Sequence, residues 1–340
     1  MKDLPEIIRD EEELSEVLSR PWPSVVEFVK GLDGDILVLG AGGKIGPTLV
    51  RMLARAAADA GVRKEVIAVG RRPLDAPPQG VRTVACDLLD LDAVARLPHV
   101  PNVFFLAGRK FGSTGNEPLT WATNVIVPHH VARTFAASRV VAFSTGGVYP
   151  IMDAATGGAT EETPPDPVGE YSMSCLGRER MFDYFSRTAG ARVVHLRLNY
   201  AVEMRYGVLV DVATKVWNRL PVDVTTGWAN VIWQGDVCAY TILSLQAAAS
   251  PARPLNITGP GMISIRETAA AFGRLLEREP IIVGKENGRG YLSNASRSHA
   301  LFGPPQVPLE RVIQWTAHWV RAGGCNLGKP THFEVQDGKY

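Results

Sequence analysis

The stretch Asp35-Ile-Leu-Val-Leu-Gly40-Ala-Gly-Gly43-Lys-Ile-Gly46 decides the fold of this chain. Its apolar residues 36–39 do not alternate with polar ones, which is typical of a strand covered on both faces of a parallel sheet. The Ala-rich residues 45–58 that follow predict a helix. A glycine turn between strand and helix directs backbone N–H groups at an anion and lets a pyrophosphate approach closely. Nucleotide binding is therefore the first hypothesis.

The glycine spacing narrows that hypothesis. Gly40, Gly43 and Gly46 form G-x-x-G-x-x-G, whereas the commonest dinucleotide fingerprint is G-x-G-x-x-G. Lys44 is followed by Ile45, which excludes the phosphate-binding Walker loop because that motif requires Ser or Thr after its lysine. We expect these five residues to bind a dinucleotide, and the alternative is a tight strand–helix turn without a ligand.

Composition excludes several classes of partner. The 340 residues carry a net charge of +1, and Lys and Arg are scattered among Asp and Glu, so we expect neither a nucleic-acid surface nor an anionic-membrane surface. The longest uncharged run, residues 237–252, is too short to span a bilayer. A small neutral or mildly anionic molecule is the expected ligand.

Cysteine usage and the N-terminus indicate the compartment. The four cysteines stand alone, with no C-x-x-C pair, and the N-terminus is acidic where a signal peptide would be basic and then apolar. These features predict a cytoplasmic protein with free thiols. The adjacent His129 and His130 have no Cys, His or carboxylate at metal-ligand spacing, so no metal site is expected.

Four more segments predict strands, at residues 66–70, 82–86, 103–108 and 140–144. Because helical segments separate them, the expected fold class is α/β with a doubly wound parallel sheet, whose ligands bind where the strands end. The residues expected at those ends, besides the glycine turn, are Asp87, Leu88, Ala107, Gly108, Lys110 and Thr145.

The chain divides into four expected parts. They are an N-terminal extension (1–33), a dinucleotide-binding domain (34–198 plus 231–258), a smaller mixed substrate lobe (199–230 plus 259–325) and a C-terminal tail (326–340). The extension contains two predicted short helices, at 11–20 and 23–30. The tail could cross to a neighbouring copy, which keeps a homodimer open.

The second predicted strand bears on the choice of cofactor. An acidic residue at its end would accept hydrogen bonds from the ribose hydroxyls and select NAD, whereas an arginine can hold a 2′-phosphate and select NADP. Here Gly70 is followed by Arg71 and Arg72, so NADP is favoured and NAD is the alternative. Both arginines could instead be solvated loop residues. Asp87 and Leu88, after the third strand, are expected at the adenine.

Motifs farther along the chain carry a family resemblance. The motifs are Thr145-Gly-Gly-Val-Tyr149, Glu162-Thr-Pro, Tyr171-Ser-Met-Ser174, Leu196-Arg-Leu-Asn199, Trp233-Gln-Gly-Asp236-Val and Asn256-Ile-Thr-Gly259. With the glycine turn, Asp87 and Asn124, they make the chain resemble an extended short-chain dehydrogenase/reductase, the NAD-dependent epimerase/dehydratase family, over nearly all residues after 34. The resemblance implies a Rossmann-type domain and a small-molecule substrate.

The resemblance also implies roles for single residues. Tyr171 corresponds to the catalytic tyrosine, which exchanges a proton with a substrate hydroxyl while hydride passes to or from nicotinamide. Thr145 corresponds to the Ser or Thr that orients this hydroxyl. Gly146, Asn199 and Trp228 are expected on the substrate side, where Trp228 could stack on a sugar ring or belong to the core.

The chain departs from the family at Cys175, which stands where the catalytic lysine would follow Tyr171. A free tyrosine titrates near 10, so the missing ammonium matters, and a neutral thiol cannot replace it. Lys110 is the expected source of positive charge, although it could equally bind cofactor phosphate or lie on the surface. Arg178, one turn beyond Cys175, is expected to lie too far along the helix.

A second departure concerns the substrate. Two family arginines that hold the diphosphate of nucleotide sugars correspond to Ala229 and His299 in an ungapped alignment. The sequence therefore predicts an NAD(P)-dependent oxidoreductase, epimerase or dehydratase acting on a sugar or polyol without a nucleoside diphosphate. The alternative is a non-catalytic NAD(P)-binding sensor or regulatory protein with the same fold.

Overall fold

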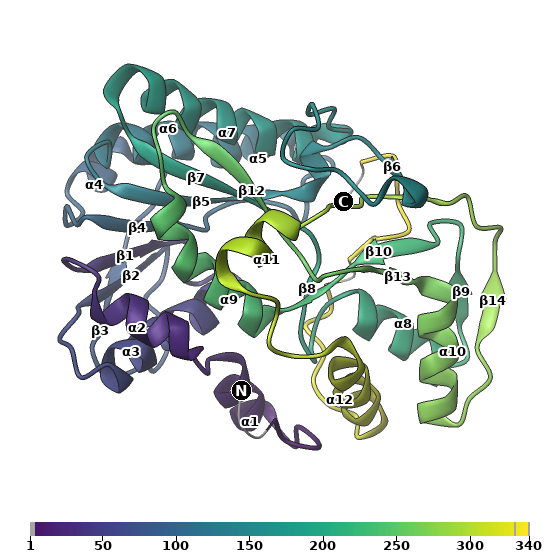
Figure 1. Cartoon of the computed structure of the whole chain (residues 1–340). Coiled ribbons are helices and arrows are strands. Elements are labelled where there is room, and N and C mark those ends of the chain that lie inside the picture. Colours follow the sequence, from purple (N-terminus) through teal and green to yellow (C-terminus); the bar gives the residue numbers. More distant parts are fainter. Residues whose placement is uncertain (1–3, 330, 339–340) are drawn as a thin grey trace.

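Seven parallel strands form the central sheet of the protein, whose computed structural model describes residues 4–329 and 331–338 (Figure 1). In sheet order they are β12 (Arg253–Ile257), β7 (Arg192–Leu198), β5 (Arg139–Thr145), β4 (Asn102–Phe105), β1 (Ile36–Leu39), β2 (Val66–Gly70) and β3 (Val81–Ala85). Ile36 of β1 lies opposite Val66 of β2 and Asn102 of β4. The strand order reverses between β1 and β4, which is where doubly wound sheets bind ligands. The predicted α/β fold class is confirmed.

Helices cover both faces of this sheet (Figure 1). On one face lie α2 (Pro23–Lys30), α3 (Gly46–Asp59) and α9 (Gln234–Leu243), and on the other lie α4 (Leu91–Ala95), α5 (Glu117–Trp121), η1 (Ala122–Ile126), α6 (Val127–Thr134) and α7 (Gly169–Ala189). Ile36 and Val38 join the first core, and Leu37 and Leu39 join the second. Each face of β1 is therefore apolar, which is why its sequence shows no alternation.

The N-terminal extension packs against the α9 side. It contains α1 (Glu11–Leu18) and α2, in the segments where two short helices were predicted. Trp22 between them is buried, its Nε1 donates to Asp236 Oδ1 (3.1 Å), and its ring meets Tyr240 edge-on with centroids 5.1 Å apart. Trp22 and α2 thus join a core of the sheet domain, whereas Leu14, Val17 and Leu18 of α1 join the core of the second lobe.

The lobe predicted to bind the substrate, called the substrate lobe below, is built around the second large core. Its elements are β8 (Ala201–Val202), α8 (Val208–Trp217), β9 (Pro221–Asp223), β10 (Trp228–Asn230), β11 (Ile232–Trp233), β13 (Met262–Ser264), α10 (Ile265–Leu276), β14 (Ile281–Val283) and α12 (Leu309–Arg321). Short elements complete the chain: η2 (Gly146–Val148), β6 (Met152–Asp153), η3 (Ala154–Thr156), η4 (Ser244–Ala247), β15 (Arg289–Gly290) and α11 (Ser296–Phe302). The β10–β13 pair is antiparallel and the β9–β14 pair parallel, so the lobe is mixed.

The C-terminal segment folds back over its own chain. Leu327 N donates to Arg205 O (3.0 Å), and Thr331 N and Oγ1 donate to Asp211 Oδ2 (2.9 and 2.5 Å). The backbone of Gly338 abuts Gly169 at the start of α7. The described part of the tail makes these contacts within its own chain. Residues 330, 339 and 340 lie outside the described part.

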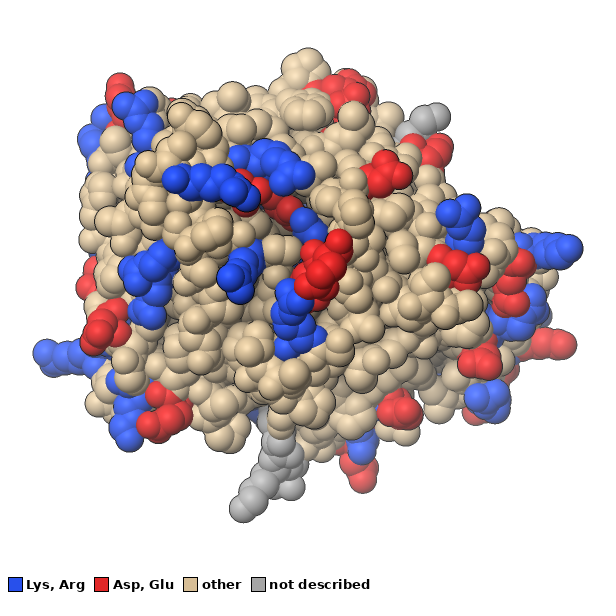
Figure 2. Space-filling model, turned by 45° about the horizontal axis from the view of Figure 1, so that its top comes forward, with Lys and Arg blue, Asp and Glu red and all other residues tan. Residues whose placement is uncertain are grey.

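Charged side chains are mixed in sign on the face seen in Figure 2, where Lys and Arg are interspersed with Asp and Glu. This mixture is in keeping with the net charge of +1. Among the residues described, none of the helices has both the length and the apolar character that crossing a bilayer demands.

Candidate cofactor and active site

The glycine turn joins β1 to α3 and needs glycine for packing. Gly40 has φ +87°, and a Cβ there would lie 2.5 Å from Ala107 N. A Cβ at Gly46 would lie 2.2 Å from Ala41 O. At Gly42, in contrast, a Cβ would meet nothing within 4 Å, and this residue is exposed. The open backbone at the N-terminus of a 14-residue helix fits the pyrophosphate of a dinucleotide.

Lys44 leaves the turn and reaches the other lobe. Gly43 N donates to Gly40 O (3.0 Å), and Ile45 packs against the core, which together hold the turn. Lys44 Nζ donates to Ala201 O (3.2 Å) and lies 3.4 Å from the ring centroid of Tyr206. Burial lowers the pKa of Lys44 to about 7, which Glu203 partly opposes. Lys44 was predicted as a cofactor residue, and its ammonium lies on the substrate side.

The end of β2 lies beside the turn. A Cβ at Gly70 would stand 3.6 Å from Gly42 N, so a side chain at this position would face the glycine turn. Arg71 and Arg72 follow and are exposed. The structure thus brings both arginines to the edge of the nucleotide site.

The end of β3 is shaped by Asp87 and Leu88. Asp87 is exposed, and its Oδ1 accepts from Leu89 N (3.0 Å). Leu88 is buried, and its carbonyl oxygen lies 3.2 Å from Nδ1 of His130. Both residues stand at the same edge of the sheet as the glycine turn, as predicted for an adenine site.

Tyr171 and Thr145 are brought together by α7 and β5. The hydroxyl of Tyr171 hydrogen-bonds with the side chains of Thr145 and Cys175. Gly147 N donates to Thr145 Oγ1 (3.1 Å), which leaves the Thr145 hydroxyl proton for Tyr171. The predicted catalytic pair is therefore in hydrogen-bond contact, with the thiol beside it.

The site keeps Tyr171 protonated in the protein without ligands. Burial raises the pKa of Tyr171 well above its ordinary value, the neighbouring Cys175 raises it further, and Arg178 opposes both. Burial likewise raises the pKa of the Cys175 thiol. A phenolate at Tyr171 therefore needs positive charge nearby.

Arg178 lies closer to the site than the sequence suggested. Its Nη1 donates to Phe143 O and its Nη2 to Asn124 Oδ1, both at 2.8 Å. A Cβ at Gly108 would lie 2.4 Å from Arg178 Nη2, so the guanidinium sits directly against the end of β4. The side chain is buried, and its charge lowers the pKa of Tyr171. The length of an arginine, which a position on a helix does not convey, explains this reach.

Lys110 lies near the same tyrosine, as predicted. Its Nζ is 5.9 Å from the ring centroid of Tyr171 and 5.9 Å from that of Phe111. Burial lowers the pKa of Lys110 to about 8, and Cys175 opposes this effect. Two cationic side chains, Lys110 and Arg178, thus lie near Tyr171.

Gly146 and Asn199, both predicted on the substrate side, lie together beside Thr145. A Cβ at Gly146 would lie 3.1 Å from Asn199 Cγ and 3.1 Å from Ser293 Oγ. Asn199 Nδ2 donates to Tyr291 O (2.7 Å) and to Ser293 Oγ (3.4 Å). Sequence reasoning missed Ser293, because it enters from a distant loop that carries no recognisable motif.

The remaining substrate-side residues lie farther into the lobe. Trp228 is half-buried in β10, and Ala229 after it is buried opposite Ile263. His299 Nε2 lies 3.0 Å from Thr258 O, and its ring stacks on Tyr240. The side chain of Ala229 is thus packed inside the lobe, and that of His299 contacts Thr258 and Tyr240.

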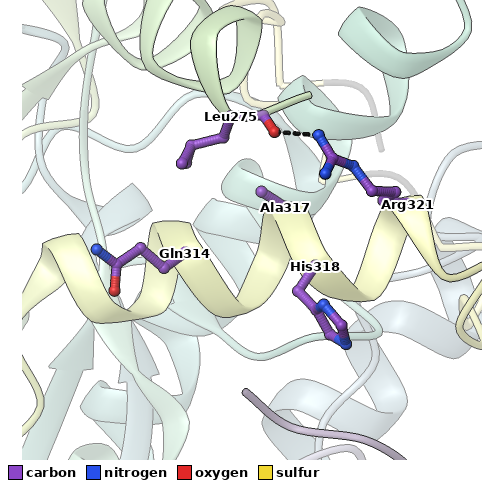
Figure 3. A pocket seen from close by; sticks show the side chains of 5 residues that line it. All are labelled: Leu275, Gln314, Ala317, His318 and Arg321. Carbon is purple, nitrogen blue, oxygen red and sulfur yellow. Dashed lines mark hydrogen bonds between the residues drawn. The ribbon is translucent and has the colours of Figure 1, made fainter. Parts of the chain in front are cut away.

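A concavity also lies between α10 and α12, remote from these residues (Figure 3). The side chains that line it are Leu275, Gln314, Ala317, His318 and Arg321. The Arg321 guanidinium donates to the Leu275 carbonyl. None of the residues predicted for catalysis or cofactor binding lines this concavity, so we place the functional site at the carboxyl edge of the sheet.

Known structures share this fold. The dehydratase DesIV from Streptomyces venezuelae, a dTDP-glucose 4,6-dehydratase solved with NAD, aligns with a TM-score of 0.72 and 23% identity over 85% of this chain and 97% of that one. The UDP-glucose 4-epimerase of Thermotoga maritima, solved with UDP-glucose, aligns with a TM-score of 0.68 and 18% identity over 85% of this chain and 99% of that one. The UDP-glucose 4-epimerase of Thermus thermophilus, solved with NAD, aligns with a TM-score of 0.67 and 21% identity over 84% of this chain and 99% of that one.

Sequence comparison is more specific about the family. A search of curated proteins gives no match. Residues 36–202, which hold the glycine turn, Thr145 and Tyr171, match the model of the NAD dependent epimerase/dehydratase family. The match covers both the cofactor turn and the catalytic pair, and the structural likenesses agree with it in fold. The segment 36–202, with the glycine turn, Thr145 and Tyr171, accordingly belongs to the NAD-dependent epimerase/dehydratase family.

Proposed function

We propose that the protein is an NAD(P)-dependent oxidoreductase, epimerase or dehydratase that acts on a sugar or polyol without a nucleoside diphosphate. One observation carries the proposal: the hydrogen-bonded pair of Tyr171 and Thr145 stands at the carboxyl edge of the sheet that also presents the glycine turn. This geometry joins a proton-transfer group to a dinucleotide site, as hydride chemistry requires.

The protein's own groups divide the work. Nicotinamide, when bound, exchanges a hydride with the carbon that carries the reacting hydroxyl. Tyr171 takes or returns the hydroxyl proton, and Thr145 orients that hydroxyl. Arg178 stabilises the phenolate form of Tyr171, with Lys110 as a second source of charge. This assignment gives Arg178 the electrostatic role that a lysine at position 175 would have.

The residues at positions 229 and 299 support a substrate without a nucleoside diphosphate. The compared relatives were solved with nucleotide sugars or are named for them. In this chain Ala229 is buried in β10 and His299 is engaged with Thr258 and Tyr240, so neither supplies a charge to a diphosphate. Charge-assisted contacts to phosphate are among the stronger hydrogen bonds, and their loss favours a free sugar.

NADP is the proposed cofactor, with NAD as the alternative. Gly70 faces the turn where an acidic residue would bind the ribose hydroxyls, and Arg71 and Arg72 are exposed next to it. An arginine there can pair with a 2′-phosphate. The relatives solved with NAD do not decide this choice, because their identity to the chain is below one quarter.

The decisive experiment offers free sugars, polyols and sugar acids to the purified protein with NAD or NADP. Cofactor absorbance reports oxidation, and magnetic resonance of the sugar reports epimerisation or dehydration without net reduction. Tyr171→Phe should lower turnover by about 10²-fold to 10⁴-fold, the usual contribution of a general acid–base group. Tyr184→Phe, at an exposed position of the same helix, is the matched control. Unchanged turnover in Tyr171→Phe would rule out the proposal.

A non-catalytic sensor is the second candidate, and one observation favours it. Both Tyr171 and Cys175 have raised pKa values, so the site resists forming the phenolate. A sensor would bind the dinucleotide with an affinity that Tyr171→Phe barely changes and would turn over none of the offered sugars. Calorimetric titration alongside the activity screen separates the two candidates.

We also propose a homodimer through α5, η1 and α7, which pack against one another. Met173 of α7 and Ile126 of η1 are apolar and are 44% and 48% exposed. Met173→Glu should therefore dissociate the dimer in sedimentation velocity. Leu301→Glu, at an exposed leucine of α11, is the control and should leave the mass unchanged.

A further inference from the structure

Three lysines from separate segments converge on one aromatic pair. Phe111, after β4, and Tyr206, after β8, meet edge-on with ring centroids 6.1 Å apart. Lys44 Nζ stands 3.4 Å from the Tyr206 centroid, and Lys110 and Lys329 stand 5.9 and 5.7 Å from that of Phe111. The lysines come from the glycine turn, the loop after β4 and the C-terminal segment. The pair thus marks a place where the two lobes and the tail meet.

The C-terminal segment holds its lysine in place from both sides. Two residues before Lys329, Leu327 N donates to Arg205 O (3.0 Å), in the same loop as Tyr206. Two residues after it, Thr331 donates from its amide and its hydroxyl to Asp211. Both anchors, Arg205 and Asp211, lie on the substrate lobe and hold the segment that carries Lys329 beside the aromatic pair.

The acids that face this cluster are bonded to other groups. Glu203 pairs with Arg205 (3.3 Å), and Asp211 accepts from Thr331. Burial lowers the pKa of Lys44 to about 7, and Glu203 opposes this shift. Burial also lowers the pKa of Lys110 to about 8, and Cys175 and Asp211 oppose that shift. Lys110 and Arg205 lower the pKa of Lys44 further. A bound anion would restore the charge of both ammonium groups.

The position of the cluster indicates which molecule brings the anion. Lys44 points away from the glycine turn to Ala201 of the substrate lobe. Lys110 Nζ lies as close to the Tyr171 ring as to the Phe111 ring, at 5.9 Å from each centroid. An anion at the cluster therefore stands beside the reacting hydroxyl and belongs to the substrate.

We propose that Lys44, Lys110 and Lys329 bind an oxyanion carried by the sugar itself, a carboxylate or a phosphate monoester, next to Tyr171. The substrate is then an acidic sugar, and the C-terminal segment completes its site. This inference rests on the proposed function, since it takes Tyr171 as the point where the reacting hydroxyl is held.

Calorimetric titration of the protein loaded with reduced cofactor tests the site. The probes are glucuronate, glucose 6-phosphate, inorganic phosphate and neutral glucose. We expect one of the acidic sugars to bind at least about tenfold more tightly than glucose, because its anionic group accepts charge-assisted hydrogen bonds from the lysines. Preference for glucuronate assigns a carboxylate, and preference for glucose 6-phosphate or binding of inorganic phosphate assigns a phosphate. Equal affinity for all sugars would overturn the proposal.

Lys329→Gln is the informative variant, because Lys329 is exposed and the hydrogen bonds of Leu327 and Thr331 on either side of it do not involve its side chain. It should weaken the acidic probe about tenfold or more, make its binding less sensitive to salt, and leave cofactor affinity unchanged. Lys285→Gln removes an exposed lysine of the same lobe and is the charge-matched control. The proposed site is contradicted if Lys329→Gln keeps its affinity for the acidic probe, or if Lys329→Gln and Lys285→Gln lose affinity equally.

Proton uptake supplies an independent readout. At about pH 8 the binding of an acidic probe should take up a proton at Lys44 or Lys110, so the heat should differ between buffers of different ionisation enthalpy. Identical heats contradict the site. The inference and the proposed function fail separately: Tyr171-dependent turnover with no effect of Lys329→Gln refutes only the anion site. Binding that needs Lys329, with turnover unaffected by Tyr171→Phe, refutes only the chemistry.

Discussion

Arg178 and Gly108 are in direct contact: a Cβ at Gly108 would lie 2.4 Å from Nη2 of the buried guanidinium. The absence of a side chain at 108 lets Arg178 reach the end of β4 while its other nitrogen donates to Phe143. From there its charge lowers the pKa of Tyr171. The geometry of this one contact therefore links the sheet edge to the proposed acid–base chemistry.

Gly108→Ala should displace Arg178 without unfolding the protein. The added methyl meets the end of a flexible side chain, so we expect a loss of about 1–3 kcal/mol of unfolding free energy. Turnover should fall further, up to roughly 100-fold, because a small misplacement of a charge at the site is costly. Gly261→Ala is the control, since a Cβ there meets nothing within 4 Å. Equal turnover in both variants would contradict the role of the contact.

Arg178→Met should raise the pKa of Tyr171 further, because the charge that opposes the rise is removed. The rise of activity with pH should then move to more alkaline values, and Arg178→Lys should restore part of the change. Denaturant unfolding of both variants separates this effect from the loss of the hydrogen bonds to Asn124 and Phe143. A pH profile that is the same in Arg178→Met and the wild type would show that Arg178 is structural only.

Cys175→Ala should shift the same profile in the opposite direction. The thiol raises the pKa of Tyr171, so its removal lowers that pKa and extends activity toward neutral pH. The small cavity should cost about 1 kcal/mol of unfolding free energy. Cys238→Ala, at an equally buried cysteine of α9, should show a comparable cost with no change in the pH profile.

Arg71→Gln and Arg72→Gln should weaken NADP binding and leave NAD binding unchanged. Loss of a charged contact to the 2′-phosphate is worth roughly 1.5–3 kcal/mol, or about ten- to 100-fold in affinity. Fluorescence titration with each cofactor measures the difference, with Arg96→Gln as an exposed control. Tighter binding of NAD than of NADP by the wild type would end the NADP preference.

Asp236 should make stability depend on pH. Burial raises its pKa to about 6 from 3.8, although Val307 N and Trp22 Nε1 donate to it. A raised folded-state pKa gives stability that is present below the unfolded value and is lost as pH rises through about 6. We expect roughly 3 kcal/mol of unfolding free energy to be lost as the pH rises from about 4 to above about 6. Asp236→Asn should remove this slope in urea titrations, and an unchanged slope would assign it to other groups.

Local sequence was sufficient to predict the sheet and the glycine turn after β1. The uniformly apolar residues 36–39 form β1, buried on both faces, because a strand inside a parallel sheet has no solvent face. Gly40, Gly43 and Gly46 form the turn, since tight packing against Ala107 and Ala41 excludes a Cβ at two of them. Such signals are readable because cause and consequence lie within a few residues of each other.

Tertiary structure alone decided which charges meet at the site. Position on α7 suggested that Arg178 was too distant, yet the missing side chain at Gly108 gives its guanidinium a place beside Tyr171. Nothing near Lys329 in the sequence indicates that it joins Lys44 and Lys110 around one aromatic pair. Sequence fixes which groups a chain carries, whereas the distances between groups on separate segments, and hence their electrostatic coupling, exist only once the chain has folded.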